Sequence, residues 1–432
     1  MTAGHSLLPS RRTYLAVLFV AAFLIRFGVV LGLRDIHKFH SQTAGGVDAV
    51  EFNAIALNLA AGRGYAVTPG YPTSFRAPGM PFFLSALYRL SYENYELGYL
   101  ALITIGALTC LLTYFAAREI LTENWARVAG MLSAVYLPHV YFSTVFLSEV
   151  LFAFCVGLGL WLVLRCFRTP SGWLLAGAGL ALGYGALARP IGLLLPLFLL
   201  PALIRWSGFN AGRLMRSIVP LFLAAAAVIL PWTLRNYAVH HHWVLITTNG
   251  GSTFYGANND ITLRDRHYLG SWIATNYLPG RKAIEATPDE YSHDRLEWKL
   301  GKDWVASHAV DLPLLTAYKI ARFWLPDLSS GNRKFVLMEV AGYTPVGILI
   351  LLGIYISLRK GTGPGWPAVD GILAANLVST VVFYGSARFR DSITPVLMIY
   401  AAAGLERTIW WWKGRKAGHR AAIAPESRLN PS

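Results

Sequence analysis

The sequence predicts an all-α polytopic membrane protein of about ten transmembrane helices, with two long segments outside the membrane. Of its 432 residues, 55% are hydrophobic and only 14% are charged, whereas soluble domains carry about 25% charged residues. Its apolar runs are long and continuous, which favours helices over the short alternating strands of a membrane barrel. Helices also satisfy their own backbone hydrogen bonds in lipid.

Ten apolar runs approach the roughly 20 residues that cross a hydrocarbon core. They are 13–33, 95–117, 126–142, 145–164, 173–188, 191–205, 216–236, 335–357, 367–385 and 392–412. Only Arg189-Pro190 interrupts the stretch 173–206. As one helix at ~1.5 Å per residue, this stretch would be about 50 Å long, which exceeds the ~30 Å core. Because proline disfavours helix at the residue before it, we expect a break here and two spans.

The net charge of +15 has a membrane explanation. A nucleic-acid-binding protein would gather its Lys and Arg in a patch on a soluble domain. Here most of them stand at the ends of apolar runs, which is the positive-inside pattern with a cytoplasmic N-terminus. We find no Walker A, GxGxxG or HExxH motif, so no ATP or dinucleotide site is indicated.

These spans divide the chain into four parts. Residues 1–236 form a transmembrane module that includes a first periplasmic loop, 34–94. A second periplasmic region, 237–334, precedes the C-terminal transmembrane helices, 335–412, and a cytoplasmic tail, 413–432. In the first loop, apolar positions at helical spacing predict an interfacial helix from Val47 to Gly62.

Few ionisable residues fall at the periplasmic ends of the spans, and we expect these residues to be functional. They are Asp48, Glu51, Arg76, Glu149, Arg189, Arg235, Arg388 and Arg390. A carboxylate can remove a proton and a guanidinium can hold a phosphate, and lipid phosphates lie at this depth. We therefore predict that the three carboxylates are catalytic and that the arginines bind substrate. The turn at Asn249 could add backbone donors for a phosphate or a sugar.

Each of these residues also has a structural interpretation. Asp48 and Glu51 could form a capping box, and Glu149 could cap a span or pair with an arginine. Any single arginine could extend to the lipid headgroups, but that explanation accounts poorly for five of them on the less charged side. The tract His240-His241-His242 lacks partners at ligand spacing. No metal site is predicted and no cofactor is certain, although a divalent metal remains compatible with the sequence.

Short motifs in order between residues 13 and 407 resemble those of a known class. They are Gly46-Val47-Asp48-Ala49, Asn58 to Tyr65, Arg76-Ala77-Pro78-Gly79, Ser148-Glu149, Ala188-Arg189-Pro190, Pro231-Trp232 with Arg235-Asn236-Tyr237, Thr248-Asn249-Gly250-Gly251 and Ala387 to Arg390 with Pro395. The class is the bacterial GT-C membrane glycosyltransferases of the protein-mannosyltransferase and aminoarabinose-transferase type, glycosyltransferase family 39.

This resemblance implies a function and a site. It implies a conserved module of seven spans, an active site at the periplasmic membrane surface and a polyprenyl-phosphate-linked sugar donor. It also implies an inverting transfer to an acceptor hydroxyl of a lipid, glycan or protein, with Asp48 as the base. Family members that modify protein carry adjacent acidic residues here, but Ala49 follows Asp48, so protein is not singled out as the acceptor.

Two other functions fit parts of the same pattern. One is a transporter or flippase of lipid-linked saccharide, which would line a midplane path with charges in paired halves; the charge here is one-sided and no such symmetry is visible. The other is a glycan ligase or polymerase that uses a lipid diphosphate, which the sequence separates poorly from a monophosphate-dependent enzyme.

The charge pattern makes a testable prediction about topology. We expect reporters fused after Ser171 and Asn210 to give a cytoplasmic signal, and reporters fused after Ser91 and Asn259 to give a periplasmic one, because the Lys and Arg at the ends of the spans favour a cytoplasmic location for the first pair. Paired alkaline phosphatase and green fluorescent protein fusions measure this. A cytoplasmic signal at Asn259 would put the second loop on the wrong side for a lipid-phosphate sugar donor.

Overall fold

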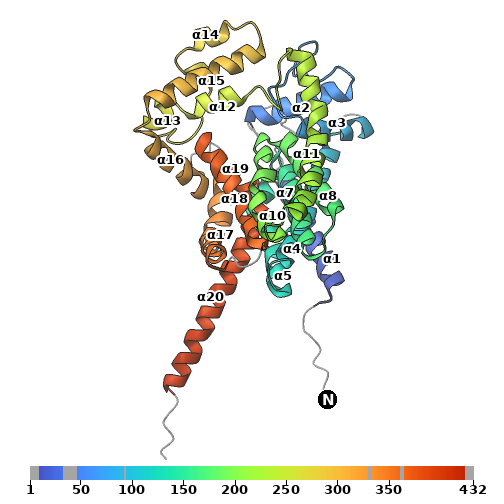
Figure 1. Ribbon diagram of the computed structural model, residues 1–432, viewed down its shortest axis with the longest axis vertical. Coiled ribbons are helices and arrows are strands. Elements are labelled where there is room, and N and C mark those ends of the chain that lie inside the picture. The colour runs from blue at the N-terminus through green and yellow to red at the C-terminus, as the bar shows by residue number, and fades with distance from the viewer. Residues whose placement is uncertain (1–8, 33–45, 92–93, 329–332, 361–363, 424–432) are drawn as a thin grey trace, which may run out of the picture.

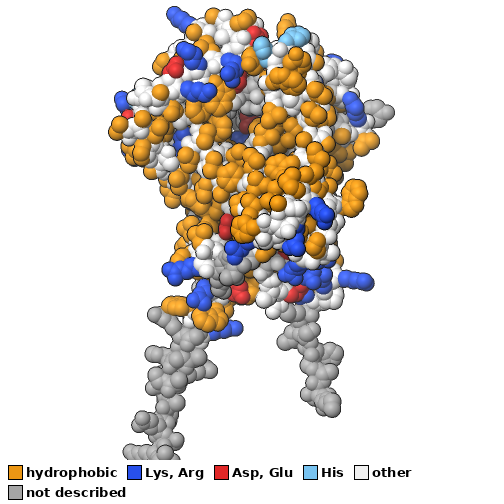
Figure 2. All heavy atoms as spheres, in the orientation of Figure 1, with side chains coloured by type: hydrophobic (Ala, Val, Ile, Leu, Met, Phe, Trp, Pro, Cys, Tyr) orange, Lys and Arg blue, Asp and Glu red, His pale blue; other side chains and the backbone are white. Residues whose placement is uncertain are grey.

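The computed structural model describes residues 9–32, 46–91, 94–328, 333–360 and 364–423. Within these ranges the chain is helical and contains no strand (Figure 1). Hydrophobic side chains cover the middle of the body, and Lys and Arg side chains gather near its lower end (Figure 2). The prediction of an all-α polytopic membrane protein is confirmed.

Among the residues that the structure describes, seven helical segments are long and apolar enough to cross a membrane. They are α1 (Arg11–Gly32), α4 (Tyr95–Arg118), α7 (Glu149–Arg168), the segment Pro190–Ser207, α11 (Ala211–His240), α17 (Arg333–Lys360) and α18 (Gly365–Val382). A shorter apolar helix, α8 (Gly172–Ala188), packs against α7 and α11. The last helix, α20 (Thr394–Ile423), contains most of the predicted run 392–412. The count of ten spans stays a prediction.

The run expected at 126–142 is not one helix. It forms α5 (Glu123–Val135) and α6 (Leu137–Phe142), with Tyr136 extended between them. Pro138 lies in the first turn of α6, where its missing N–H is tolerated. Arg26 of α1 is fully buried and donates hydrogen bonds to Ser133 O and Ala134 O, carbonyls near the end of α5. An intramembrane arginine thus satisfies the backbone that the break exposes.

The predicted break at Arg189-Pro190 is confirmed. Helix α8 ends at Ala188, Arg189 is extended, and the chain continues through η2 (Pro190–Leu194), α9 (Leu195–Phe198) and α10 (Leu200–Ser207). The first loop reaches this break through Gly79, where a Cβ atom would lie 2.6 Å from Ala188 N. Only glycine allows this approach, which brings the start of α3 (Gly79–Ser91) to the residue before Arg189.

The two segments predicted to lie outside the membrane occupy the same end of the bundle, opposite the start of α1 (Figure 1). The first contributes α2 (Gly46–Ala60) and α3, so the interfacial helix predicted from Val47 is confirmed as a helix. The second forms a small helical unit. Its helices are α12 (Gly250–Ala257), α13 (Asp260–Arg264), η3 (Thr275–Tyr277), α14 (Arg281–Glu285), α15 (Glu290–Ser307) and α16 (Leu312–Trp324). A short helix, α19 (Ala387–Asp391), precedes α20.

Candidate active site

Six of the predicted site residues form one chain of ion pairs, which we name the ionic cluster. Its members alternate in sign and come from five parts of the chain: Glu51, Arg76, Asp48, Arg388, Glu149 and Arg189. The charges of three carboxylates and three guanidiniums cancel. The cluster joins the first loop to the ends of α7 and α8 and to α19.

Asp48 and Glu51 present their carboxylates to the same arginine. They are three residues apart on α2, so they share one face of the helix. Arg76 donates from Nη1 to Asp48 Oδ1 at 2.7 Å and from Nε to Glu51. The side chain of Arg76 is only 15% exposed. Although Asp48 lies in the first turn of α2, both carboxylates engage Arg76, so they join the cluster and do more than cap the helix.

Arg388 connects the two halves of the cluster. Its Nη1 lies 3.2 Å from Asp48 Oδ2, and its Nε lies 2.6 Å from Glu149 Oε1. Arg189 Nη1 contacts the same Glu149 oxygen at 2.8 Å. Glu149 is fully buried at the first turn of α7, where the helix N-terminus favours negative charge. Two guanidiniums compensate this buried carboxylate, because an unpaired ion there would be strongly destabilising.

The charges around Asp48 determine its protonation. Burial alone would raise the pKa of this carboxyl group, but the positive charges of Arg388 and Arg76 outweigh burial and lower its pKa below the usual value. Asp48 is therefore ionised at neutral pH. Its side chain is 32% exposed, so a ligand can reach the carboxylate.

Arg235 lies in a different network. Its Nη1 donates to Thr73 O and to Ser74 Oγ, each at 2.8 Å, and its Nη2 donates to Tyr65 O at 3.2 Å. Its guanidinium also stacks over Trp232, 4.7 Å from the ring centroid. Arg235 thus ties the end of α11 to the part of the first loop that leads to Arg76.

Arg390 and Asn249 also lie outside the ionic cluster. Arg390 is fully buried, pairs with Glu339 at 2.6 Å and with Asp391 at 3.0 Å, and faces the ring of Tyr343. This second network fixes α19 against α17, and so fixes the helix that carries Arg388. Asn249 precedes α12 and accepts a hydrogen bond from Thr247 Oγ1 at 2.9 Å.

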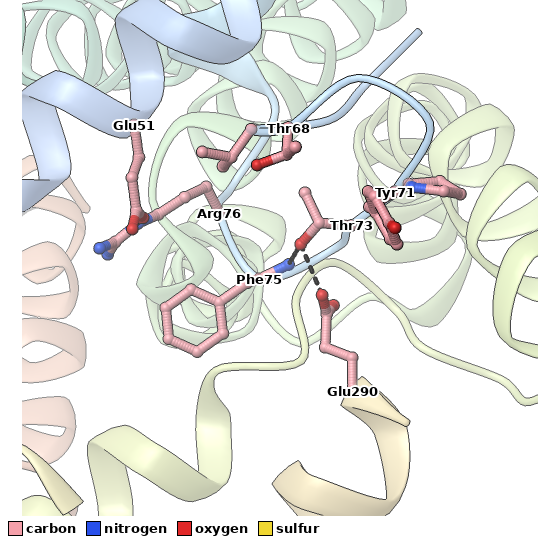
Figure 3. Close-up of a pocket in the computed structure, with 9 residues that line it drawn as sticks. Glu51, Thr68, Tyr71, Thr73, Phe75, Arg76 and Glu290 are labelled. Carbon is pink, nitrogen blue, oxygen red and sulfur yellow. Dashed lines mark hydrogen bonds and ion pairs between the residues drawn. The ribbon is translucent and has the colours of Figure 1, made fainter. Parts of the chain in front are cut away.

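Glu290 is a site residue that the sequence analysis missed. It begins α15 and reaches the first loop, accepting hydrogen bonds from Thr73 Oγ1 at 2.6 Å and from Ser74 N at 2.8 Å (Figure 3). Thr248 Oγ1 donates to the same carboxylate. Glu290 sits in a segment rich in exposed charge, so no signal of spacing or composition distinguishes it from its neighbours.

A cavity of about 470 Å³ opens beside the ionic cluster. Glu51 and Arg76 line one side and Glu290 the other, with Thr68, Tyr71 and Phe75 between them (Figure 3). A second cavity, of about 440 Å³, is lined by 384–387, directly before Arg388, and by several apolar residues of 321–328. The ionic cluster thus lines the first cavity through Glu51 and Arg76, and the second cavity, which is largely apolar, lies along the residues directly before Arg388.

The described part of the chain contains no group of three His, Cys, Asp or Glu side chains that could hold a metal ion. In the histidine tract, His240 contacts Ser74 Oγ at 2.8 Å and lies 3.8 Å from Glu290 Oε1. His240 therefore takes part in the contacts that hold the first loop.

The chain is similar to known membrane glycosyltransferases. Residues 75–234 match a family model described as dolichyl-phosphate-mannose-protein mannosyltransferase, and no curated protein matches the chain in sequence. The fold resembles the oligosaccharyltransferase AglB of Archaeoglobus fulgidus, solved with an inhibitory peptide and a dolichol-phosphate (TM-score 0.53, 12% identity, 97% of this chain and 53% of that chain). The same enzyme tethered to an acceptor peptide gives a TM-score of 0.56 at 16% identity, over 97% and 52% of the two chains.

A further solved structure is ArnT from Cupriavidus metallidurans bound to undecaprenyl phosphate (TM-score 0.46, 14% identity, 91% of this chain and 78% of that chain). The chain spans about half the length of the archaeal oligosaccharyltransferase. The predicted resemblance to GT-C membrane glycosyltransferases is confirmed by the family match and by the archaeal fold.

The contacts of Glu290 predict that it orders the first loop. In Glu290→Ala, we expect the Ser74 amide and its neighbours to exchange hydrogen about 10- to 100-fold faster, because a hydrogen bond to a charged group contributes about 1.5–3 kcal/mol. Hydrogen–deuterium exchange of peptides covering 65–76 measures this. Glu285→Ala is the matched control, since Glu285 is 52% exposed and pairs with Arg281. Equal protection in both variants would contradict this role for Glu290.

Proposed function

We propose that this chain is an inverting glycosyltransferase that moves a sugar from a polyprenyl-phosphate donor to an acceptor hydroxyl. The reaction would take place at the periplasmic face of the bacterial inner membrane. The observation that carries this proposal is the ionised Asp48 carboxylate between two guanidiniums, those of Arg76 and Arg388. A proton acceptor next to a phosphate-binding cation is what the transfer requires. The match to a family that uses dolichyl-phosphate-mannose supports this donor class.

The transfer would be a single displacement. The acceptor oxygen forms a bond to the anomeric carbon of the sugar while the bond from that carbon to the phosphate oxygen breaks. Asp48 takes the acceptor proton, and the lipid monophosphate leaves with the bonding electron pair. Because the acceptor attacks from the face opposite the phosphate, the anomeric configuration inverts.

Arg388 is the proposed phosphate ligand. Its side chain is 32% exposed, so it can contact a donor, and it holds Asp48 only through Nη1 at 3.2 Å. A bound phosphate would compete with Asp48 for this guanidinium. Partial loss of that partner would raise the pKa of Asp48 and make it a stronger base at the moment the donor is bound. Fixed positive charge at the leaving group is also a large contribution to catalysis.

The other predicted residues receive supporting roles. Glu149 is buried and bonded to two arginines, so we propose that it fixes Arg388 and Arg189 for the phosphate. Arg390 would hold α19 in place from its buried network, and Arg235 would hold the first loop. Asn249 directly precedes α12 and follows Thr248, which donates a hydrogen bond to Glu290. No step above depends on a metal, although a divalent metal stays compatible with the sequence.

The two cavities support an assignment of the two substrates. Leu325, Pro326 and Leu328 line the cavity next to residues 384–387, and such apolar side chains suit the lipid part of the donor. The cavity beside Arg76 carries two carboxylates, Glu51 and Glu290, together with hydroxyl groups, which suit an acceptor that carries hydroxyls. In this arrangement the donor phosphate reaches Arg388 from one side and the acceptor reaches Asp48 from the side of Arg76.

The role of Asp48 predicts the effect of one substitution. Asp48→Asn keeps the size of the side chain but cannot accept a proton, so we expect sugar transfer to fall about 10²- to 10⁴-fold. Purified protein in nanodiscs, supplied with lipid-phosphate sugar and acceptor extract, measures this transfer. Detection of the released lipid as a monophosphate or a diphosphate also separates this enzyme from a ligase or polymerase.

The control for this substitution is Asp303→Asn, which removes a carboxylate that is 63% exposed and should leave transfer unchanged. Thermal stability and donor binding of Asp48→Asn should stay close to those of the unmodified protein, because Glu51 and Glu149 still pair with Arg76 and Arg388. Near-normal sugar transfer by Asp48→Asn would contradict the proposal that Asp48 is the base.

The role of Arg388 predicts a change in lipid-phosphate binding. Arg388→Ala should weaken binding of undecaprenyl monophosphate by about one to two decades, since a hydrogen bond to a charged group contributes about 1.5–3 kcal/mol. Arg388→Lys should restore part of the affinity, because lysine keeps the charge without the fork of donors. Arg281→Ala, which removes an arginine 58% exposed, is the control. Unchanged binding in Arg388→Ala would remove Arg388 from the phosphate site.

A further inference from the structure

The cavity of about 470 Å³ beside Arg76 has the properties of a binding site. Ligand pockets in proteins measure about 300–1,000 Å³ and combine apolar surfaces with a few convergent polar groups. Here Val67, Pro72 and the rings of Tyr71 and Phe75 supply the apolar surface, and Thr68 and Thr73 add hydroxyl groups. The cavity joins two separate segments, because Glu290 of α15 closes the side opposite Glu51 of α2 (Figure 3).

The charge of the cavity restricts its ligand. Glu51 and Glu290 are both acceptors of hydrogen bonds, and Arg76 is the only Lys or Arg among the residues that line it. Arg76 already donates to Glu51 and to Asp48. The lining therefore carries a net negative charge with its cation engaged, which disfavours phosphates and carboxylates. Ionised carboxylates only accept hydrogen bonds, so the favoured ligand brings hydroxyl donors.

The aromatic side chains add a preference for flat, weakly polar faces. Tyr71 stands at the cavity with its side chain 74% exposed. Phe75 also lines the cavity, and the Arg76 guanidinium lies 5.1 Å from its ring centroid. An exposed tyrosine leaves apolar surface in contact with water unless a ligand covers it. Sugar rings fit, because they present C–H groups on their faces and hydroxyl groups around their edges.

We propose that this cavity is the acceptor subsite and that it takes an uncharged carbohydrate, whose hydroxyl group is the nucleophile. This inference rests on the proposed glycosyl transfer, and it adds the class of the acceptor. A sugar ring against Tyr71 would place its hydroxyl edge toward Glu51 and Arg76. Asp48 is bonded to that same arginine at 2.7 Å, so the acceptor lies next to the base.

A peptide acceptor fits these observations less well. An extended peptide is commonly held by backbone hydrogen bonds to a strand edge, and the described residues contain no strand. The hydroxyls and carboxylates that line the cavity are partly committed to holding the loop, as Thr73 and Glu290 show. A compact polyol that meets Tyr71 and Glu51 needs no such edge.

Binding in the absence of donor tests this proposal. Protein in nanodiscs is mixed with a set of neutral methyl glycosides and disaccharides, with the matching sugar 6-phosphates, and with a short threonine-containing peptide. Saturation-transfer difference NMR reports which of them bind. We expect at least one neutral glycoside to bind, and we expect the sugar phosphates and the peptide to give no signal above that of empty nanodiscs.

Two matched variants locate the binding. Tyr71→Ala should raise the apparent Kd of the bound glycoside about two- to tenfold. Tyr277→Ala, which removes an equally exposed tyrosine (70%) outside the cavity, should leave that Kd unchanged. Neither substitution removes a buried group, so thermal stability should be the same in both. Peptide binding without glycoside binding, or equal Kd values in the two variants, overturns the proposal.

The outcomes of this experiment are separable from those of the transfer assay. If Tyr71→Ala transfers sugar to a carbohydrate acceptor at the unmodified rate, the proposed glycosyltransferase activity stands and only the proposed acceptor subsite is overturned. Glycoside binding that depends on Tyr71, without transfer from any lipid-phosphate sugar, would keep the subsite as a carbohydrate site and overturn the proposed function together with the acceptor role.

Discussion

The pairing of Asp48 with two arginines is the interaction on which the rest of the site depends. Arg76 precedes α3 and Arg388 belongs to α19, so a single carboxylate connects parts of the chain more than 300 residues apart. The same arginines bind Glu51 and Glu149, and the charges alternate from α2 to Arg189. If Asp48 is removed, Arg76 still pairs with Glu51 and Arg388 still pairs with Glu149.

The cost of burying charge explains why these side chains occur as a cluster. A buried ion is costly unless it is paired and hydrogen-bonded. Glu149 meets that condition through two guanidiniums, and Arg390 meets it through Glu339 and Asp391. The ionic cluster has partly exposed members and lines a cavity through Glu51 and Arg76, whereas the network of Arg390 is fully enclosed. Similar pairings therefore serve different ends: one can receive a ligand and the other holds a helix.

The second segment that is predicted to lie outside the membrane contacts the first loop beside the ionic cluster. Glu290 fixes the loop at Thr73 and Ser74, and Arg235 fixes the same loop from α11. The loop is thus held from two sides directly before Arg76. The proline-rich part of the first loop forms no helix, so it lacks the regular backbone hydrogen bonds that a helix would supply. Side-chain contacts replace those bonds and hold Arg76 next to Asp48.

Local sequence patterns predicted the class of fold, the break at Arg189-Pro190, the helix that carries Asp48 and the six members of the ionic cluster. The length of an apolar run, the effect of proline on a helix and the rarity of charged residues at the ends of spans are local properties, so they can be recognised in the sequence. Tertiary structure decided which charges meet. It divided the predicted arginines among the cluster, the loop contacts of Arg235 and the enclosed network of Arg390, and it brought in Glu290. Ion pairing depends on distances of a few ångströms between segments remote in sequence, and no local pattern encodes those distances.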